Sequence, residues 1–192
     1  MAGLQGRLST SIPLGCWILA CLIIIASATA SSAHAEEPAW TLGAHFGGDV
    51  VDNMDENASI ASIYGRRQLA TPEWLANWTP RGTSAHLDAT ATYLEIDDDG
   101  GAHLAVGPVL AWRAPEGPWR VTGGVQPTLI SDHDPSTREL GGPLQFTLHL
   151  EAGIALNDRA TIGLQWRHTS NADLYDDNDG INVQLLSVDW RF

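Results

Sequence analysis

The chain has 192 residues and a formal net charge of −13, and all ten of its cations are arginines. This length suits a single domain. The acidic charge argues against a nucleic-acid binder, which needs a basic surface, and the lack of lysine excludes Schiff-base chemistry. Composition alone does not separate a globular enzyme from a membrane barrel, so the pattern along the chain has to decide.

Residues 1–35 are typical of a secretory signal peptide. Arg7 lies at the basic end, an apolar stretch follows, and Ala33-His34-Ala35 forms an A-x-A cleavage pattern. An uncleaved membrane anchor over 13–30 and a lipoprotein acylated at Cys21 are the alternatives. We expect cleavage after Ala35, which leaves 36–192 as one domain. That domain has no cysteine, and therefore no disulfide and no thiolate site.

After the signal peptide, apolar and polar side chains alternate with a period of two, which is the signature of β-strands. The clearest run covers 144–156. One strand changes phase at Leu94 and Ile96, and we interpret this change as a bulge. Eight strands are expected, near 40–46, 57–67, 85–93, 102–113, 119–129, 144–156, 162–167 and 186–192.

A water-soluble sandwich would alternate too, but two features favour a membrane barrel. Several strands reach the length that crosses a bilayer at a tilt, and the last strand stays in phase up to the terminal Phe192. We therefore expect an all-β, eight-stranded antiparallel transmembrane β-barrel of the bacterial outer membrane, filled by side chains. Its interior should pair the charges of His45, His86, Asp88, His103, Arg113, Arg120, His149, Glu151, Arg167, Asp189 and Arg191.

Acidic residues gather in the connections near 52–57, 97–101, 131–142 and 171–180, which face outward if the N-terminus is periplasmic. Divalent cations bridging these loops to lipopolysaccharide are one hypothesis, and a solvated repulsive surface is the simpler one. The four histidines of the interior set are expected to hydrogen-bond rather than to form a metal cluster. We expect no metal and no cofactor. Trp74 and Trp78 are expected to anchor the barrel at the membrane interface.

One constellation suggests chemistry. His168 and Ser170 are two residues apart at a strand end, so they project from one face, which Trp166 marks as the lipid-facing side. A histidine can take the proton of a serine hydroxyl and activate it to attack an ester. Asn182 opens the last strand with matching parity and is the candidate third member of a triad. Taken alone, such a pair is more typical of a barrel rim than of a catalytic site.

The run His168-Thr169-Ser170-Asn171-Ala172 resembles the H-x-S-N-A motif of the outer-membrane lipid A 3-O-deacylase (PagL-like) family. Residues 140–147 resemble the beginning of that family's sixth strand. Residues 178–182 resemble its N-P-G-x-(E/N) element, and 190–192 its aromatic-Arg-Phe ending. Before residue 140 the resemblance is only architectural.

The resemblance implies a lipid-facing active site that hydrolyses the ester-linked acyl chain at position 3 of lipid A. By position, Ser170 would be the nucleophile and His168 the general base, while Asn171 with a neighbouring backbone N–H would stabilise the oxyanion. Asn182 stands where the family's type member has a glutamate. An amide orients the imidazole but does not stabilise its charge, which implies a slower enzyme. Asp177 and Asp179 are alternative third groups.

Other functions stay open at this point. A non-catalytic outer-membrane barrel with a structural or surface-binding role would need neither Ser170 nor His168. A soluble periplasmic β-domain, an acyltransferase and a phospholipase are further alternatives. The expected partners are lipid A of lipopolysaccharide, outer-membrane lipids and a second copy of the chain as a homodimer, with no nucleic acid.

Overall fold

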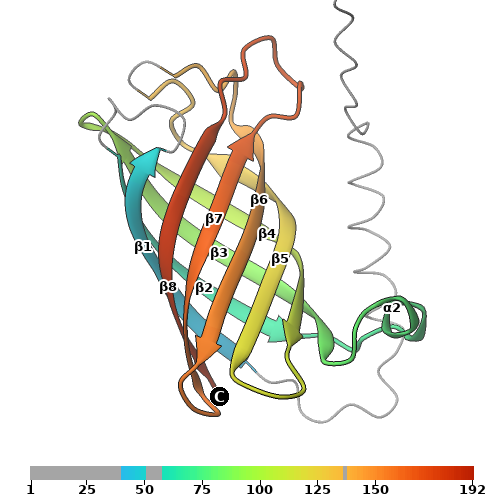
Figure 1. Cartoon of the computed structure of the whole chain (residues 1–192). Helices are drawn as coiled ribbons and strands as arrows, with labels where there is room; N and C mark the ends of the chain where they lie inside the picture. The colour runs from blue at the N-terminus through green and yellow to red at the C-terminus, as the bar shows by residue number, and fades with distance from the viewer. Residues whose placement is uncertain (1–39, 51–57, 136–137) are drawn as a thin grey trace, which may run out of the picture.

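The computed structural model describes residues 40–50, 58–135 and 138–192 (Figure 1). The expected signal peptide over 1–35 lies outside the described residues. The strands are β1 (Trp40–Val50), β2 (Ala58–Gln68), β3 (Thr83–Ile96), β4 (Asp99–Arg113), β5 (Trp119–Ile130), β6 (Leu144–Ala155), β7 (Ala160–Ser170) and β8 (Ile181–Arg191).

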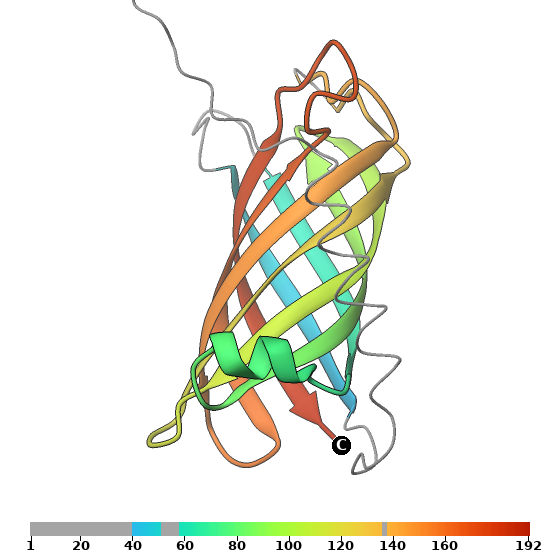
Figure 2. The same cartoon turned by 90° about the vertical axis from the view of Figure 1, so that its right-hand side faces the viewer.

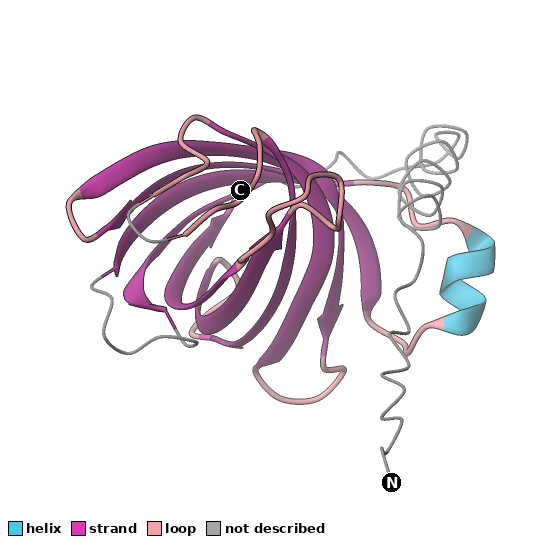
Figure 3. Ribbon diagram, turned by 90° about the horizontal axis from the view of Figure 1, so that it is seen from above, coloured by secondary structure: helices cyan, strands magenta, loops and turns pink. Residues whose placement is uncertain are grey.

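Each strand pairs antiparallel with the next, and β8 pairs with β1, so the sheet closes into a barrel. The predicted closed, eight-stranded antiparallel barrel is confirmed. We call the end that holds Phe192 the C-terminal end, and the opposite end, which holds the connections 131–143 and 171–180, the loop end (Figure 1). Figure 3 shows from above how the strands curve around the barrel. No described helix is long and apolar enough to cross a membrane.

The alternation in the sequence becomes the two faces of the wall. Apolar side chains point outward, as Ile63 does with 70% of its surface exposed. Polar side chains point inward, and among them the Arg66 guanidinium pairs with the Asp88 carboxylate at 2.8 Å. Arg167 donates to Gln165 Oε1 at 2.9 Å. These partners lower the cost of keeping charges out of water inside the wall.

The predicted interior set does face the lumen. His45, Asp88, His103, His149, Glu151, Arg167 and Asp189 are buried, whereas His86, Arg120 and Arg191 are half-buried and Arg113 is exposed at the C-terminal end. Within the described ranges, no group of three His, Cys, Asp or Glu side chains is placed to hold a metal ion.

At the loop end the interior turns apolar. Leu94 and Ile96 are buried there, and the pairing of β3 with β2 and with β4 runs through both residues without a register shift. The predicted bulge is therefore wrong, because the change of phase marks a change from a polar to an apolar lumen. The apolar cluster that closes the loop end consists of Ile60, Leu94, Ile96, Ile130, Leu140, Ile181, Val183 and Leu185.

The connection between β2 and β3 contains a short helix that the sequence pattern did not predict. Helix α2 (Glu73–Trp78) lies outside the barrel wall near the C-terminal end (Figure 2). Leu75 is buried, while Trp74 is half exposed and Trp78 is 88% exposed. Two exposed tryptophans at this position are compatible with the expected interfacial anchor.

Candidate active site

The last residues of β7 present His168 and Ser170 on the outside of the barrel. Their neighbours Arg167 and Thr169 are buried in the lumen, so the strand alternates strictly up to its end. Trp166, one step earlier on the outer face, is exposed. The parity of the sequence therefore placed both side chains on the correct face.

The register between β7 and β8 brings the third residue into contact. His168 and Asn182 are direct cross-strand partners. His168 Nδ1 lies 2.9 Å from Asn182 Oδ1, and His168 Nε2 lies 3.1 Å from Ser170 Oγ. The structure thus joins Ser170, His168 and Asn182 in one chain of hydrogen bonds.

This chain fixes which imidazole nitrogen is basic. Because the amide oxygen of Asn182 accepts, Nδ1 of His168 carries the proton and donates it. Nε2 then keeps its lone pair and accepts from the Ser170 hydroxyl. That tautomer is the one a general base needs in a serine hydrolase.

Two neighbours restrict the imidazole further. The Trp166 ring lies nearly parallel to the ring of His168, with 6.2 Å between the ring centroids. Gly180 has a φ of +66°, and a Cβ there would lie 3.3 Å from His168 Cε1. A larger residue at position 180 would press on the imidazole as well as strain the backbone.

Asn171 is used differently from the expectation that its side chain meets an oxyanion. It is fully buried, and its amide nitrogen donates to the Leu140 carbonyl at 2.9 Å and to the Asp177 carbonyl at 2.5 Å. Its backbone N–H donates to Asn178 Oδ1 at 3.0 Å. The side-chain amide and the backbone N–H of Asn171 are therefore both engaged. What remains of the prediction is an oxyanion site made of backbone N–H groups after Asn171.

Hydrogen bonds connect the two loops, 131–143 and 171–180, that lie beside the Ser170–His168 pair, which we call the dyad. The Glu139 N–H donates to Asp179 Oδ2 at 2.8 Å, and the Asp179 N–H donates back to the Glu139 carbonyl at 3.1 Å. Buried Arg138 donates to the Gly180 carbonyl at 2.5 Å. These contacts connect 131–143 to the segment that packs against His168.

Sequence reasoning missed the part that Arg138 plays. It is the only cation in the two loops, which are otherwise acidic, and that contrast was the available signal. Asp179, one of the alternative third groups, is not the partner of the imidazole. The Asp179 carboxylate accepts from the Glu139 backbone, and the imidazole Nδ1 is bound to Asn182.

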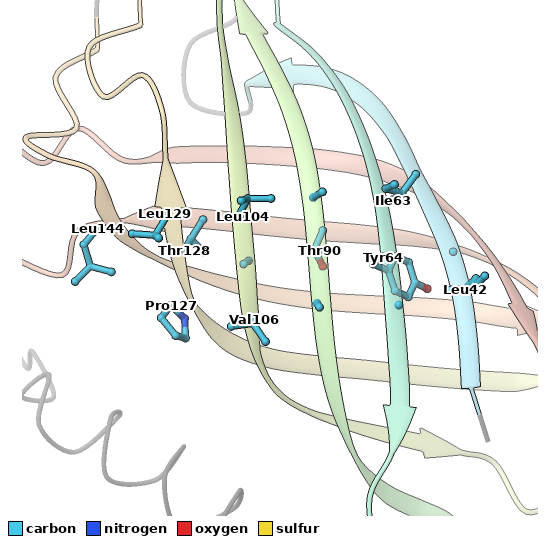
Figure 4. A pocket seen from close by; sticks show the side chains of 15 residues that line it. Leu42, Ile63, Tyr64, Thr90, Leu104, Val106, Pro127, Thr128, Leu129 and Leu144 are labelled. Atoms are coloured by element: carbon cyan, nitrogen blue, oxygen red, sulfur yellow. The ribbon is translucent and has the colours of Figure 1, made fainter. Parts of the chain in front are cut away.

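Exposed apolar side chains lie beside His168 and Ser170 on the outer face of the wall. Leu148 of β6 is the cross-strand partner of His168 and is itself exposed. An apolar hollow of about 880 Å³ does indent the wall, but it extends over β1 to β5 with a rim at Leu144 (Figure 4). Its lining does not include His168 or Ser170. Ser170 is half-buried on the outer face of β7.

Comparison with known proteins agrees with this arrangement. The family described as "Lipid A 3-O-deacylase (PagL)" matches residues 63–191, more than half of the chain. The chain belongs to the PagL family. The matched range contains His168, Ser170 and Asn182 and the two connections 131–143 and 171–180.

Two known proteins are similar to this chain, one in sequence and one in structure. "Lipid A deacylase PagL" of Bordetella bronchiseptica (strain ATCC BAA-588 / NCTC 13252 / RB50) is 27% identical over 85 residues, which cover 44% of this chain and 47% of that relative. The alignment thus spans about half the length of the curated PagL. The crystal structure of the outer membrane enzyme PagL superimposes with a TM-score of 0.64 at 20% identity, covering 78% of this chain and 98% of the other. This second likeness shows that the PagL barrel fold is shared.

Proposed function

We propose that this chain is an outer-membrane serine esterase that removes the ester-linked acyl chain at position 3 of lipid A. The observation that carries the proposal is the hydrogen-bonded chain Ser170–His168–Asn182 on the outward face of β7 and β8. Membership of a lipid A deacylase family supplies the substrate class.

The reaction follows from the geometry. Ser170 Oγ attacks the ester carbonyl carbon while its proton passes to Nε2 of His168. The negative charge on the carbonyl oxygen is met by backbone N–H groups that follow Asn171 in the turn, because the Asn171 N–H donates to Asn178 Oδ1. His168 returns the proton to the departing sugar oxygen, and the acyl group stays on Ser170. Water, deprotonated by His168, then attacks the acyl carbon. The bond to Ser170 Oγ breaks, the proton returns from His168 to Oγ, and the acyl chain leaves as a free fatty acid.

The position on the wall suits a substrate that is part of the membrane. Trp166 and Leu148 offer an apolar surface to acyl chains, and both flank the imidazole. The dyad itself lies at the loop end of β7, where a polar pair meets head groups rather than the bilayer centre. An ester at the junction of a sugar and its acyl chain lies at the same depth.

Mass spectrometry of lipid A tests the proposal. The full chain is expressed in a Gram-negative host whose lipid A has an ester-linked 3-hydroxyacyl group at position 3. We expect loss of one 3-hydroxyacyl mass with the wild-type chain and no loss with Ser170→Ala. Ser59→Ala is the matched control, because Ser59 is exposed on β2 at the same end of the barrel. Unchanged lipid A in cells that contain the folded wild-type barrel would contradict the proposal.

One observation favours a second candidate. The amide of Asn182 stands where the family's type member is expected to have a carboxylate, so a barrel that has lost catalysis and binds surface ligands is the alternative. It predicts identical lipid A with the wild-type chain and with Ser170→Ala.

Parallel incubation with a diacyl phospholipid separates a phospholipase from a lipid A deacylase. Membrane fractionation checks the outer-membrane location.

A further inference from the structure

The lumen at the C-terminal end holds a second polar site, far from the dyad along the barrel. A cavity of about 470 Å³ opens there, and its lining carries several arginines from different strands. Arg113 comes from β4, Arg120 from β5 and Arg191 from β8. Nothing in the proposed hydrolysis uses these three side chains.

The arginines repel one another. Arg113 and Arg120 are direct cross-strand partners, an arrangement in which like charges destabilise a sheet. Repulsion from Arg113 and from Arg191 both act on Arg120. A bound anion would offset this repulsion.

The carboxylates nearby do not neutralise Arg120. Asp189 and Asp158 attract it, but among the described residues Arg120 forms no salt bridge. Asp189 accepts from the Tyr64 hydroxyl instead. In the same part of the chain, the buried Nε and Nη2 of Arg120 have no hydrogen-bond partner. Two guanidinium nitrogens of Arg120 therefore lack a partner within this part of the chain.

The cavity ends blindly. The polar network around Arg66 and Arg167 fills the middle of the lumen, and the apolar cluster fills the loop end. Among the described residues, these two layers lie between the cavity and the loop end. The cavity is consequently suited to binding and not to conduction.

A second serine–histidine pair lines the cavity but lacks the features of the first. Ser84 Oγ lies 2.8 Å from His86 Nε2. Nδ1 of His86 has no hydrogen-bond partner among the described residues, so nothing orients this imidazole as Asn182 orients His168. The pair adds hydrogen-bonding groups to the site and no activated nucleophile.

We propose that this cavity binds a small phosphate oxyanion, free or as a monoester, through Arg113, Arg120 and Arg191. Planar guanidinium groups match the oxygens of a phosphate with paired hydrogen bonds. The four arginines that line the cavity, with Arg66, outnumber its two carboxylates, Glu151 and Asp189. The opening at the C-terminal end faces the periplasm if the loops face outward, so the ligand enters from water.

Calorimetric titration of the detergent-purified full chain with inorganic phosphate tests the site. We expect saturable binding of one phosphate per chain, weakened at least tenfold in Arg120→Gln and in Arg191→Gln. Arg159→Gln is the matched control, because Arg159 is exposed in the β6–β7 turn at the same end and does not line the cavity. Release of acyl chains from lipid A should be unchanged in all three variants.

Competition identifies the source of the phosphate. Displacement by glycerol 3-phosphate indicates a soluble monoester, and displacement only by dihexanoyl phosphatidic acid indicates a lipid head group; either result supports the oxyanion site. Absence of saturable binding to the wild-type chain would overturn the proposal. Equal affinities for wild type, Arg120→Gln and Arg159→Gln in barrels that migrate as folded on unheated gels would overturn it as well.

Discussion

Replacing Asn182 by aspartate tests what the amide in the third position costs. Asparagine and aspartate have the same length, so Asn182→Asp puts a carboxylate oxygen where Oδ1 now lies 2.9 Å from His168 Nδ1. A carboxylate only accepts, which holds the imidazole in the tautomer that leaves Nε2 basic. Its charge also stabilises the imidazolium that forms when Ser170 loses its proton.

The size of the effect follows from the hydrogen bond. A bond to a charged group contributes about 1.5–3 kcal/mol, against about 1 kcal/mol for a neutral pair. The gain falls on the transition state, because the charge on His168 develops only there. His168 and Asn182 are half-buried, so solvent screening reduces the gain to roughly 0.5–1.5 kcal/mol. At about 1.4 kcal/mol per factor of ten, kcat should rise about twofold to tenfold with little change in KM.

The assay measures acyl release from purified lipid A in detergent micelles by mass spectrometry. Asn182→Leu should lower kcat about a hundredfold, because the imidazole loses its orienting partner. Gln184→Glu is the matched control, since it adds a negative charge to the same exposed face of β8, two residues from position 182. A folded Asn182→Asp barrel that is no faster than wild type would show that the amide is not what limits the reaction.

Three further changes probe the surroundings of the dyad and the wall. Gly180→Val should lower kcat at least tenfold in the acyl-release assay, because the valine side chain would press on the His168 imidazole. Gly117→Val, at another positive-φ glycine in a distant turn, should leave kcat unchanged. Equal kcat values for Gly180→Val and the wild type would contradict the contact. Arg138→Gln should lower kcat and speed proteolytic cleavage within 171–180, and unchanged cleavage would show that the loops hold without this arginine. Arg66→Met should destabilise the barrel by about 3–5 kcal/mol, because a buried carboxylate loses its partner; urea unfolding in vesicles measures this, and an unchanged midpoint would contradict it.

The barrel was predictable because a lipid-facing wall imposes one apolar face on every strand. The same parity put His168 and Ser170 outside, and it put Asn182 on the face that meets them. The alternation was misleading only where the lumen changes from polar to apolar. Leu94 and Ile96 point inward like the polar residues before them. In the sequence, apolar side chains at inward positions look like a shift of the alternation by one residue, which is why a bulge was predicted.

The loops could not be predicted in the same way. Asn171 follows Ser170 in the motif, but its side chain is held by carbonyls of Leu140 and Asp177. Arg138 reaches Gly180 from the other loop. Such contacts depend on how two connections meet in space, and no local periodicity encodes that meeting.

Labelling with a long-chain alkyl fluorophosphonate reports on the nucleophile itself. The reagent carries an apolar tail for the lipid-facing wall and reacts with a serine only when a base activates it. In the folded wild-type barrel we expect one adduct, on the peptide that contains Ser170, much slower labelling in His168→Gln and none in Ser170→Ala. An adduct on a different serine, or equal labelling rates with and without the imidazole, would contradict hydrolysis by this dyad.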